Sequence, residues 1–322
     1  MRQTCLNMIY ELAKRDERVV FIGSDLSPGL LQEMKDEFPD RFYMEGVYEQ
    51  NIIGMAAGLA MEGYIPYVNT IATFITRRCY EQIAVDICMH KLPIRLIGNG
   101  GGVVYAPLGP THLATEDISI MRALPDMTVT AVSDAEEMKR LMNASLDWAQ
   151  PIYIRLGKGG DEVINNPEKE FAIGKAINMH TSSNNSGLNI VLISTGVMTQ
   201  RALKVAKALE EINAHVTVLH CHTVKPLDEA TILHYAKTAQ LVVTIEENTL
   251  IGGLGSAVTD CLVENFGTNI PLIKRFGLPD RFPDKYGSQE QLLEYFGLSP
   301  EKLFTGIAAI ISAHFEKQKS VA

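Results

Sequence analysis

Residues 44–63 read MEGVYEQNIIGMAAGLAMEG and place Glu49 directly ahead of a long apolar run. Residues 52–61 present no polar face, and a helix that is apolar all round is normally buried. Burial at the start of that helix would favour the protonated form of Glu49, which can donate a hydrogen bond to a ligand nitrogen. The simpler interpretation is a first-turn Glu that stabilises the helix by roughly a few tenths of a kcal/mol. Gly54 and Gly58 would let another backbone approach closely.

Length and composition describe an ordinary globular chain. The 322 residues favour about two domains, and 46% hydrophobic with 21% charged residues allow a sizeable core. The net charge of −9 argues against nucleic acid or an anionic membrane as a partner. No apolar run approaches the roughly 18 residues of a membrane span, and charges interrupt the N-terminal apolar positions, unlike in a signal peptide. The five cysteines contain no CxxC pair and indicate reduced thiols in a cytoplasmic protein.

Short apolar runs alternate with helical patterns along the first half of the chain. The expected strands lie at 18–25, 66–71, 93–98, 127–132 and 151–156, and the expected helices at 3–15, 75–90, 116–123 and 134–147. This alternation predicts an α/β fold with a doubly wound, largely parallel sheet.

The second half repeats the alternation after a polar, turn-rich stretch at 157–188. Its expected strands are 189–194, 215–220, 241–246 and 271–275, and its helices are 198–212, 228–237, 254–266 and two within 288–317. We therefore expect a domain at 1–160, a linker at 161–188 with one edge strand at 171–179, and a second doubly wound domain at 189–322.

The informative motifs follow strands of the first domain. Phe74 and Arg77 follow one strand, the glycine-rich loop 98–102 follows the next, and Gly109-Pro-Thr-His112 comes after it. Open α/β sheets bind ligands at the carboxyl ends of their strands. A lone histidine is more often structural, but His112 in the company of Glu49, Phe74 and Arg77 favours a binding site.

Two motifs of the second domain carry weaker signals. Gly252-Gly-Leu-Gly-Ser256 precedes a helix and offers free amides to an anion, but it lacks the third glycine of GxGxxG, so a tight helix entry is the simpler interpretation. His220-Cys-His222 puts two imidazoles on one face of a strand, without further residues nearby that would complete a metal site.

Taken together, these motifs resemble the carboxyl-terminal half of transketolase and of 1-deoxyxylulose-5-phosphate synthase, and most closely the carboxyl-terminal subunit of split bacterial transketolases. The resemblance covers nearly all 322 residues. It implies a pyrimidine-binding domain followed by a transketolase C-terminal domain, and thiamine diphosphate as cofactor. Further landmarks that resemble the family are Arg122-Ala-Leu-Pro, Lys225-Pro-Leu-Asp228, Glu246-Glu247, Gly252–Ser256 and Arg275–Asp280.

The resemblance also implies roles for individual residues. Glu49 would hydrogen-bond a ring nitrogen of the aminopyrimidine, Phe74 would stack on that ring, and His112 would exchange protons with the oxygen of the donor ketone. Arg155 would hold an acidic end of the substrate. The implied set is Glu49 and His112 as catalytic, Asp25, Glu49, Phe74, Arg77 and Tyr80 as cofactor-binding, His112, Arg155, Leu108 and Gly100 as substrate-facing, and no metal ligand in this chain.

The chain departs from the family pattern in two respects. It contains no GDG motif, so the resemblance implies that Mg²⁺ (or Ca²⁺) and the diphosphate are held by a separate N-terminal subunit carrying that motif. In addition, Leu108 stands where transketolases carry an aspartate, Gly100 replaces a phosphate-contacting histidine and Gly29 replaces a serine. We expect these changes to remove sugar-phosphate contacts and enlarge the acceptor channel, so that the acceptor is not a standard pentose phosphate.

The expected protein is a transketolase-like transferase of carbohydrate metabolism that is active only with its partner. A homodimer of this chain would form the core of an α2β2 heterotetramer, with small-molecule sugars as substrates. Three alternatives stay open: the beta subunit of a 2-oxo acid dehydrogenase, a condensation like that of 1-deoxyxylulose-5-phosphate synthase, and a non-catalytic scaffold subunit.

Overall fold

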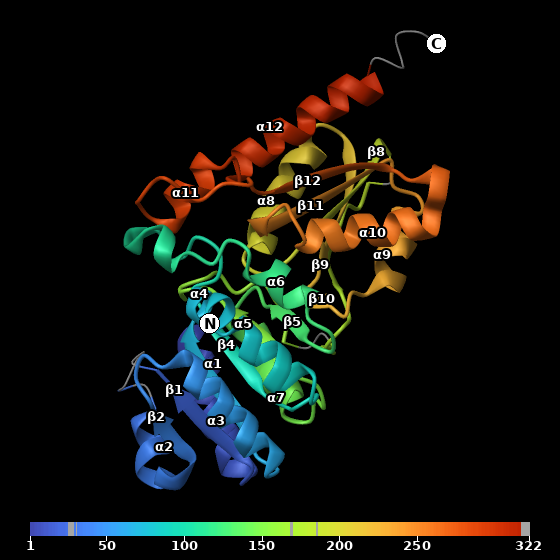
Figure 1. The fold of residues 1–322 in the computed structure, drawn as a ribbon. Helices are drawn as coiled ribbons and strands as arrows, with labels where there is room; N and C mark the ends of the chain where they lie inside the picture. Colours follow the sequence, from blue (N-terminus) through green and yellow to red (C-terminus); the bar gives the residue numbers. More distant parts are fainter. Residues whose placement is uncertain (25–28, 30, 168–169, 185, 317–322) are drawn as a thin grey trace.

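The computed structural model describes residues 1–24, 29, 31–167, 170–184 and 186–316. Each half of the chain builds its own β-sheet with helices on both faces (Figure 1). In Figure 1 the first domain, blue to green, lies below the second, yellow to red. The predicted α/β class with two doubly wound domains is confirmed.

The first sheet has seven strands in the order β10-β5-β6-β4-β3-β1-β2, all parallel to their neighbours except β10. The strands are β1 (Val19–Gly23), β2 (Phe42–Met44), β3 (Ile65–Ile71), β4 (Arg95–Asn99), β5 (Thr128–Ala131), β6 (Ile152–Leu156) and β10 (Thr223–Lys225). Phe21 pairs with Tyr67, which pairs with Arg95. Because these strands are parallel, their carboxyl ends lie along one edge of the sheet.

Helices cover both faces of this sheet. Apolar side chains of α1 and α7 pack on one face, and those of α3 and α6 pack on the other. The helices are α1 (Arg2–Arg15), α2 (Gln32–Glu37), α3 (Glu49–Met61), α4 (Ala72–Arg77), α5 (Tyr80–Gln82), α6 (Asp117–Ala123) and α7 (Ala135–Leu146), with short turns η1 (Pro39–Arg41), η2 (Ile83–Cys88), η3 (Ala106–Leu108) and η4 (Pro110–His112). The carboxyl edge therefore stays open between two helical layers.

The second sheet has five strands in the order β12-β11-β8-β9-β7. The strands are β7 (Ile177–Thr181), β8 (Leu188–Ser194), β9 (Ala214–His220), β11 (Leu241–Thr249) and β12 (Leu272–Leu278). Apolar residues of α8 and α12 pack on one face, and those of α9 and α10 on the other. The helices are α8 (Met198–Glu211), α9 (Glu229–Ala236), α10 (Leu254–Phe266), α11 (Gln289–Tyr295) and α12 (Pro300–Ile311), with η5 (Gly267–Asn269) and η6 (Ser312–Glu316).

The two domains are joined by more than a linker. Strand β10 leaves the second domain and pairs antiparallel with β5 at the edge of the first sheet. Met121 of α6 and Val258 of α10 belong to one continuous hydrophobic cluster. In the expected linker, the Asp134 carboxylate accepts hydrogen bonds from the backbone of Ile164 and Asn165, each at 2.8 Å. The edge strand expected at 171–179 is found as β7, which starts later, at Ile177.

Helix α3 is not buried on all sides, contrary to the expectation from its composition. Ile52, Ala56 and Ala60 face the core, but Gly54 and Gly58 are exposed, and Met61 is 55% exposed. A Cβ atom added at either glycine would meet no other atom within 4 Å. The apolar run therefore combines a core-facing side with a second apolar side that the single chain leaves uncovered.

The helix expected at 75–90 is divided into three short pieces. α4 ends at Arg77, α5 is a single short turn, and η2 is a π-helix in which Met89 N–H bonds to Ala84 C=O and Leu92 N–H to Ile87 C=O. The wider π-helical turn shifts the side-chain phase relative to a continuous α-helix. Residues Arg77 and Arg78 thus lie at a break between helices.

Candidate active site

Three of the predicted site residues meet at the carboxyl edge of the first sheet. Glu49 is the first residue of α3, Phe74 lies in α4 directly after β3, and His112 ends η4. The rings of Phe74 and His112 are 5.2 Å apart between centroids and meet edge to face at 61°. The structure thus brings Phe74 and His112 into direct contact and places Glu49 at the start of a helix at the same edge.

Arg78 connects Glu49 to this pair, and the sequence analysis did not single it out. Its NH1 donates to Glu49 Oε2 at 3.0 Å, and its guanidinium carbon lies 4.1 Å from the centre of the Phe74 ring. Glu49 is 2% exposed, so a buried carboxylate is held beside a half-buried aromatic ring. The pair Arg77-Arg78 was visible in the sequence, but the helix break between them decides which one reaches Glu49.

Arg77 and Tyr80 point toward α6. Both Nε and NH2 of Arg77 donate to the Glu116 carboxylate, the second at 2.8 Å, and Thr115 Oγ1 donates to the same carboxylate at 2.8 Å. Burial alone would raise the pKa of Glu116, but these donors outweigh it and lower the pKa. The Tyr80 hydroxyl donates to Ile120 C=O at 3.0 Å. Cofactor contacts by Arg77 and Tyr80 remain predictions.

Arg155 lies behind the site, in the contact between the domains. It is 7% exposed, its Nε donates to Asp117 Oδ2 at 2.8 Å, and its NH2 donates to Glu247 C=O at 2.7 Å. Burial works against the charge of Arg155, but Asp117 and Glu247 outweigh it and raise the pKa. In the single chain the guanidinium is thus engaged by protein groups, and its substrate role remains a prediction.

The substrate-facing positions differ in how open they are. Leu108 is 51% exposed at the end of η3, four residues before His112. Gly100, with φ +74, has no room for a side chain because the Tyr105 ring occupies that space. The expectation that Gly100 enlarges the acceptor channel is therefore wrong. At Gly29 a Cβ atom would meet no other atom within 4 Å, so the space beside that glycine is open. Asp25 lies outside the described residues.

A cavity of about 520 Å³ adjoins the candidate site. Glu116, the partner of Arg77, forms part of its wall on the first domain, and Phe282 forms part of its wall on the second. The guanidinium carbon of Arg77 lies 5.9 Å from the centre of the Phe282 ring. The second domain thus borders the region of the predicted site residues.

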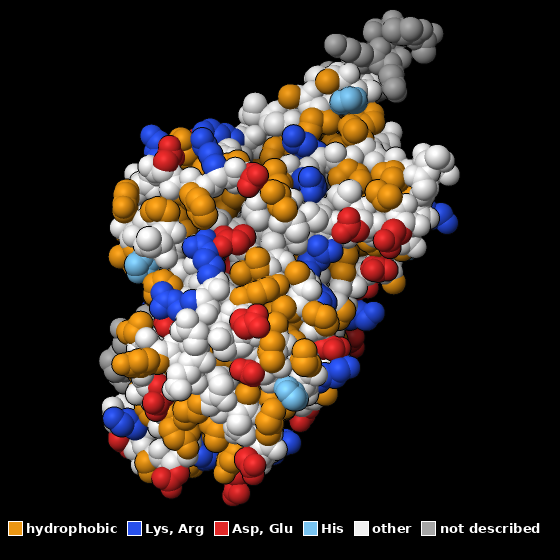
Figure 2. Space-filling view, in the orientation of Figure 1, with side chains coloured by type: hydrophobic (Ala, Val, Ile, Leu, Met, Phe, Trp, Pro, Cys, Tyr) orange, Lys and Arg blue, Asp and Glu red, His pale blue; other side chains and the backbone are white. Residues whose placement is uncertain are grey.

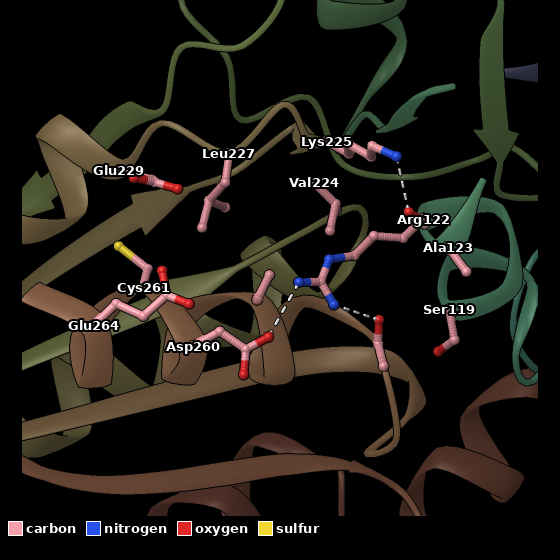
Figure 3. Close-up of a pocket in the computed structure, with 12 residues that line it drawn as sticks. Ser119, Arg122, Ala123, Val224, Lys225, Leu227, Glu229, Asp260, Cys261 and Glu264 are labelled. Atoms are coloured by element: carbon pink, nitrogen blue, oxygen red, sulfur yellow. Dashed lines mark hydrogen bonds and ion pairs between the residues drawn. The ribbon is translucent and has the colours of Figure 1, made fainter. Parts of the chain in front are cut away.

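Another interdomain cavity, of about 550 Å³, lies between α6 and α10 (Figure 3). Arg122 crosses it and donates to Gly252 C=O at 3.0 Å and to Asp260 at 3.4 Å. Lys225 Nζ donates to the Arg122 carbonyl at 3.0 Å. None of the predicted catalytic or cofactor-binding residues lines this cavity, so it is distinct from the candidate site.

The glycine-rich motif at the start of α10 receives an anion from the protein itself. The buried Glu246 carboxylate accepts hydrogen bonds from the amides of Leu254 and Gly255, each at 2.8 Å. A Cβ atom at Gly253 would collide with this carboxylate. A free anion therefore cannot use these two amides, and the tight helix entry is the correct interpretation.

The two histidines of the 220–222 motif take part in a buried interdomain network. His220 Nε2 is 2.8 Å from Glu137 Oε2, and the His222 ring stacks on Phe171 at 4.3 Å. Burial lowers the pKa of His222 to about 4. Within the described residues, no group of three or more His, Cys, Asp or Glu side chains is arranged to hold a metal ion. The same part of the chain contains no helix that is long and apolar enough to cross a bilayer.

Comparison with known proteins identifies the family. Residues 1–160 match the pyrimidine-binding domain of transketolase, and residues 181–303 match the transketolase C-terminal domain. The chain belongs to the transketolase family and corresponds to the carboxyl-terminal half of such a protein. The resemblance inferred from the sequence is confirmed.

The relatives include a protein of about the length of this chain and proteins about twice as long. The 6-deoxy-6-sulfo-D-fructose transketolase subunit SqwH of Clostridium sp. (strain MSTE9) is 34% identical over 304 residues, which are 94% of this chain and 92% of that protein. The 1-deoxy-D-xylulose-5-phosphate synthase 1 of Geobacter sulfurreducens is 34% identical over 306 residues, which are 94% of this chain but 47% of that protein. The chain thus spans about half the length of the synthase.

Solved structures agree with this assignment. A split-gene transketolase, described as an inactive β4 tetramer, matches with a TM-score of 0.85 at 31% identity and covers 96% of this chain and 97% of that one. Transketolase from Campylobacter jejuni matches with a TM-score of 0.76 at 20% identity over 95% of this chain and 46% of that one. The second likeness shows the fold alone.

Proposed function

We propose that this chain is the carboxyl-terminal subunit of a split, thiamine-diphosphate-dependent, transketolase-like enzyme of the cytoplasm. The enzyme transfers a two-carbon ketol or acyl unit to an aldehyde or sugar acceptor. The observation that carries the proposal is the cluster of Glu49, Phe74 and His112 at the carboxyl edge of the first sheet. The presence of all three residues, Glu49, Phe74 and His112, counts against a non-catalytic scaffold.

The cluster fits the aminopyrimidine end of thiamine diphosphate. Glu49 offers a nearly fully buried carboxylate, where a hydrogen bond to a ring nitrogen is strengthened by the low dielectric. Phe74 is half-buried and offers a flat apolar surface. Because the sequence contains no GDG motif, the proposal places the Mg²⁺ (or Ca²⁺) and the diphosphate end on the partner subunit.

Each residue of the cluster has a distinct task. Bound thiamine diphosphate supplies the chemistry that breaks a C–C bond beside a carbonyl. Glu49 holds a proton at the ring nitrogen, and Arg78, which contacts both Glu49 and Phe74, fixes these two groups relative to each other. His112, whose ring touches Phe74, moves a proton to or from the substrate oxygen. The apolar side of α3 that faces the core excludes water from behind Glu49.

The acceptor is proposed to be a modified sugar. Leu108 is exposed where the family carries an aspartate, and a leucine cannot accept a hydrogen bond from a sugar hydroxyl. A hydroxyl left unpaired on binding costs about 1–3 kcal/mol. The Clostridium relative is named for 6-deoxy-6-sulfo-D-fructose, a modified ketose that would serve as donor of the two-carbon unit, and it supports a modified sugar among the substrates.

The uncovered side of α3 is proposed to bind a second copy of this chain, giving the dimer at the core of an α2β2 assembly. Tyr48, directly before α3, Met61 at its end, and Val85 and Met89 of the adjacent η2 region are 39–72% exposed. We call these four residues the α3 face. Hydrophobic side chains gather on the surface over α3 (Figure 2), and monomers rarely leave such patches uncovered. Small Gly54 and Gly58 would let two backbones come close.

Reconstitution with an N-terminal subunit carrying the GDG motif tests the proposal. The complex should turn over a ketose or oxo-acid donor only when thiamine diphosphate and Mg²⁺ are present, whereas this chain alone should bind the cofactor weakly or not at all. Tight, Mg²⁺-dependent binding by the chain alone, measured by calorimetry, would contradict the split site. For xylulose 5-phosphate with ribose 5-phosphate, a kcat/KM near 10⁵ M⁻¹s⁻¹, within the ordinary range of about 10⁴–10⁸, would contradict the modified acceptor.

A condensation like that of 1-deoxyxylulose-5-phosphate synthase is the second candidate. It is favoured by the synthase relatives, which align over 94% of this chain at 34% identity in the case of Geobacter sulfurreducens. Release of CO₂ from pyruvate with glyceraldehyde 3-phosphate as acceptor, together with no turnover of ketose donors, would distinguish it from ketol transfer, because a ketose donor produces no CO₂.

A further inference from the structure

The loop that carries His112 is held by the second domain at two points. We define the His112 loop as residues 100–112 and the 279–287 segment as the stretch between β12 and α11. Figure 1 shows the chain just before α11 beside the green His112 loop, although more than 160 residues separate them in sequence. This arrangement gives the second domain direct access to the candidate site.

The first anchor is Glu247, near the end of the buried part of β11. Its carboxylate accepts a hydrogen bond from the Val103 amide at 2.8 Å and is itself held by Gln289 Nε2 at 2.9 and 3.0 Å. A Cβ atom at Gly102 would lie 2.5 Å from the Glu247 side chain, so the loop backbone is in direct contact with it. Glu247 is 2% exposed, and this anchor fixes the start of the loop.

The second anchor is Tyr286, in the 279–287 segment. A Cβ atom at Gly109 would lie 2.5 Å from Tyr286 Cε1 and 2.8 Å from Cζ, so the aromatic ring lies directly against the glycine backbone. Gly109 has φ +79, a conformation that glycine adopts without strain. Its C=O accepts the His112 N–H at 3.0 Å and so forms the turn that presents the imidazole. Tyr286 therefore packs on the turn that sets the position of His112.

We propose that Tyr286 is a positioning residue for His112, so that the second domain sets the geometry of a site built on the first. This inference rests on the proposed function for the role of His112, whereas the contact itself rests on the structure. Phe282 of the same segment lies 5.9 Å from the Arg77 guanidinium, so the segment reaches the candidate site at a further point. Tyr286 is 70% exposed, so its ring contributes little to the hydrophobic core, and its contact with the Gly109 backbone is the interaction that the proposal uses.

Hydrogen exchange on the full chain tests the contact without any assay of activity. In Tyr286→Ala we expect amides of residues 104–113 to exchange about tenfold faster, because the loop loses an aromatic contact and opens locally more often. Tyr286→Phe keeps the ring and should exchange like the wild type. Tyr64→Ala, which removes a partly exposed tyrosine just before β3, at the opposite edge of the first sheet from the His112 loop, is the matched control. Unchanged exchange in Tyr286→Ala overturns the proposal.

Kinetics of the reconstituted complex test the consequence for the reaction. A displaced catalytic group typically costs about 10- to 100-fold, so Tyr286→Ala should lower kcat by that factor, with KM for the donor little changed and activity restored in Tyr286→Phe. Faster exchange with unchanged kcat would overturn the positioning role. A wild-type complex that turns over no ketose or oxo acid would overturn the proposed function instead, and the exchange experiment would then still decide the loop contact.

Discussion

Glu246 is expected to make the stability of the second domain depend on pH near neutrality. Its carboxylate is fully buried, and burial outweighs the two amide hydrogen bonds and raises the pKa of Glu246 from 4.5 to about 7. A carboxyl group with a higher pKa in the folded chain binds its proton more tightly there, so its stabilising contribution is complete below pH 4.5 and is lost as the pH rises to about 7. At about 1.4 kcal/mol per pKa unit, the loss amounts to about 3 kcal/mol.

Urea unfolding of the wild type and of Glu246→Gln across this pH range measures the effect. The glutamine does not titrate, so the stability of the variant relative to the wild type should increase by about 3 kcal/mol between pH 4.5 and 7. Glu137→Gln provides a contrast, because His220 and the other donors outweigh burial and lower the pKa of Glu137 to about 2. The stability that the ionised Glu137 gives the wild type over Glu137→Gln should instead be lost as the pH falls from 4.5 to about 2. A constant difference between wild type and Glu246→Gln would refute the reasoning.

Two further predictions concern packing. Gly253→Ala should destabilise the chain by about 1–3 kcal/mol in thermal or urea unfolding, because its Cβ collides with the buried Glu246 carboxylate. Gly29→Ala, whose Cβ meets no atom within 4 Å, is the matched control and should not destabilise the chain. Met61→Lys should change the free energy of unfolding by less than about 0.5 kcal/mol relative to the wild type, but in sedimentation experiments it should reduce the assembly to a smaller species. Ile212→Lys, at a similarly exposed position, should not change the assembly. A Met61→Lys assembly of wild-type size would argue against the α3 face as the dimer contact.

The alternation of short apolar strands and helices was sufficient to predict both sheets. Buried parallel strands are continuous apolar runs, so β1, β3 and β8 could be located from composition alone. Strands β2 and β10 were not predicted, because three residues form no pattern and their pairing depends on distant partners. β10 in particular pairs with β5, nearly 100 residues earlier in the chain.

The sequence predicted residues for the candidate site but not the contacts between them. Glu49, Phe74 and His112 follow strands or begin helices, and the order of strands brings them together. Arg78 could not be chosen over Arg77, because the break between α4 and α5 sets the direction of each side chain. Likewise, the sequence does not show which side chain fills the space beside a glycine. At Gly100 that space is filled by the Tyr105 ring.

The central claim is that Glu49 acts in catalysis rather than as a simple helix cap. The most direct test is the turnover number of Glu49→Gln in the complex with the partner subunit, at saturating thiamine diphosphate and Mg²⁺, with Glu62→Gln at the exposed end of the same helix as the matched control. We expect Glu49→Gln to lose about 10²–10⁴-fold in turnover while its circular dichroism and melting temperature stay near those of the wild type. A loss of less than about threefold, far below the range for a proton-transfer group, would contradict the assignment.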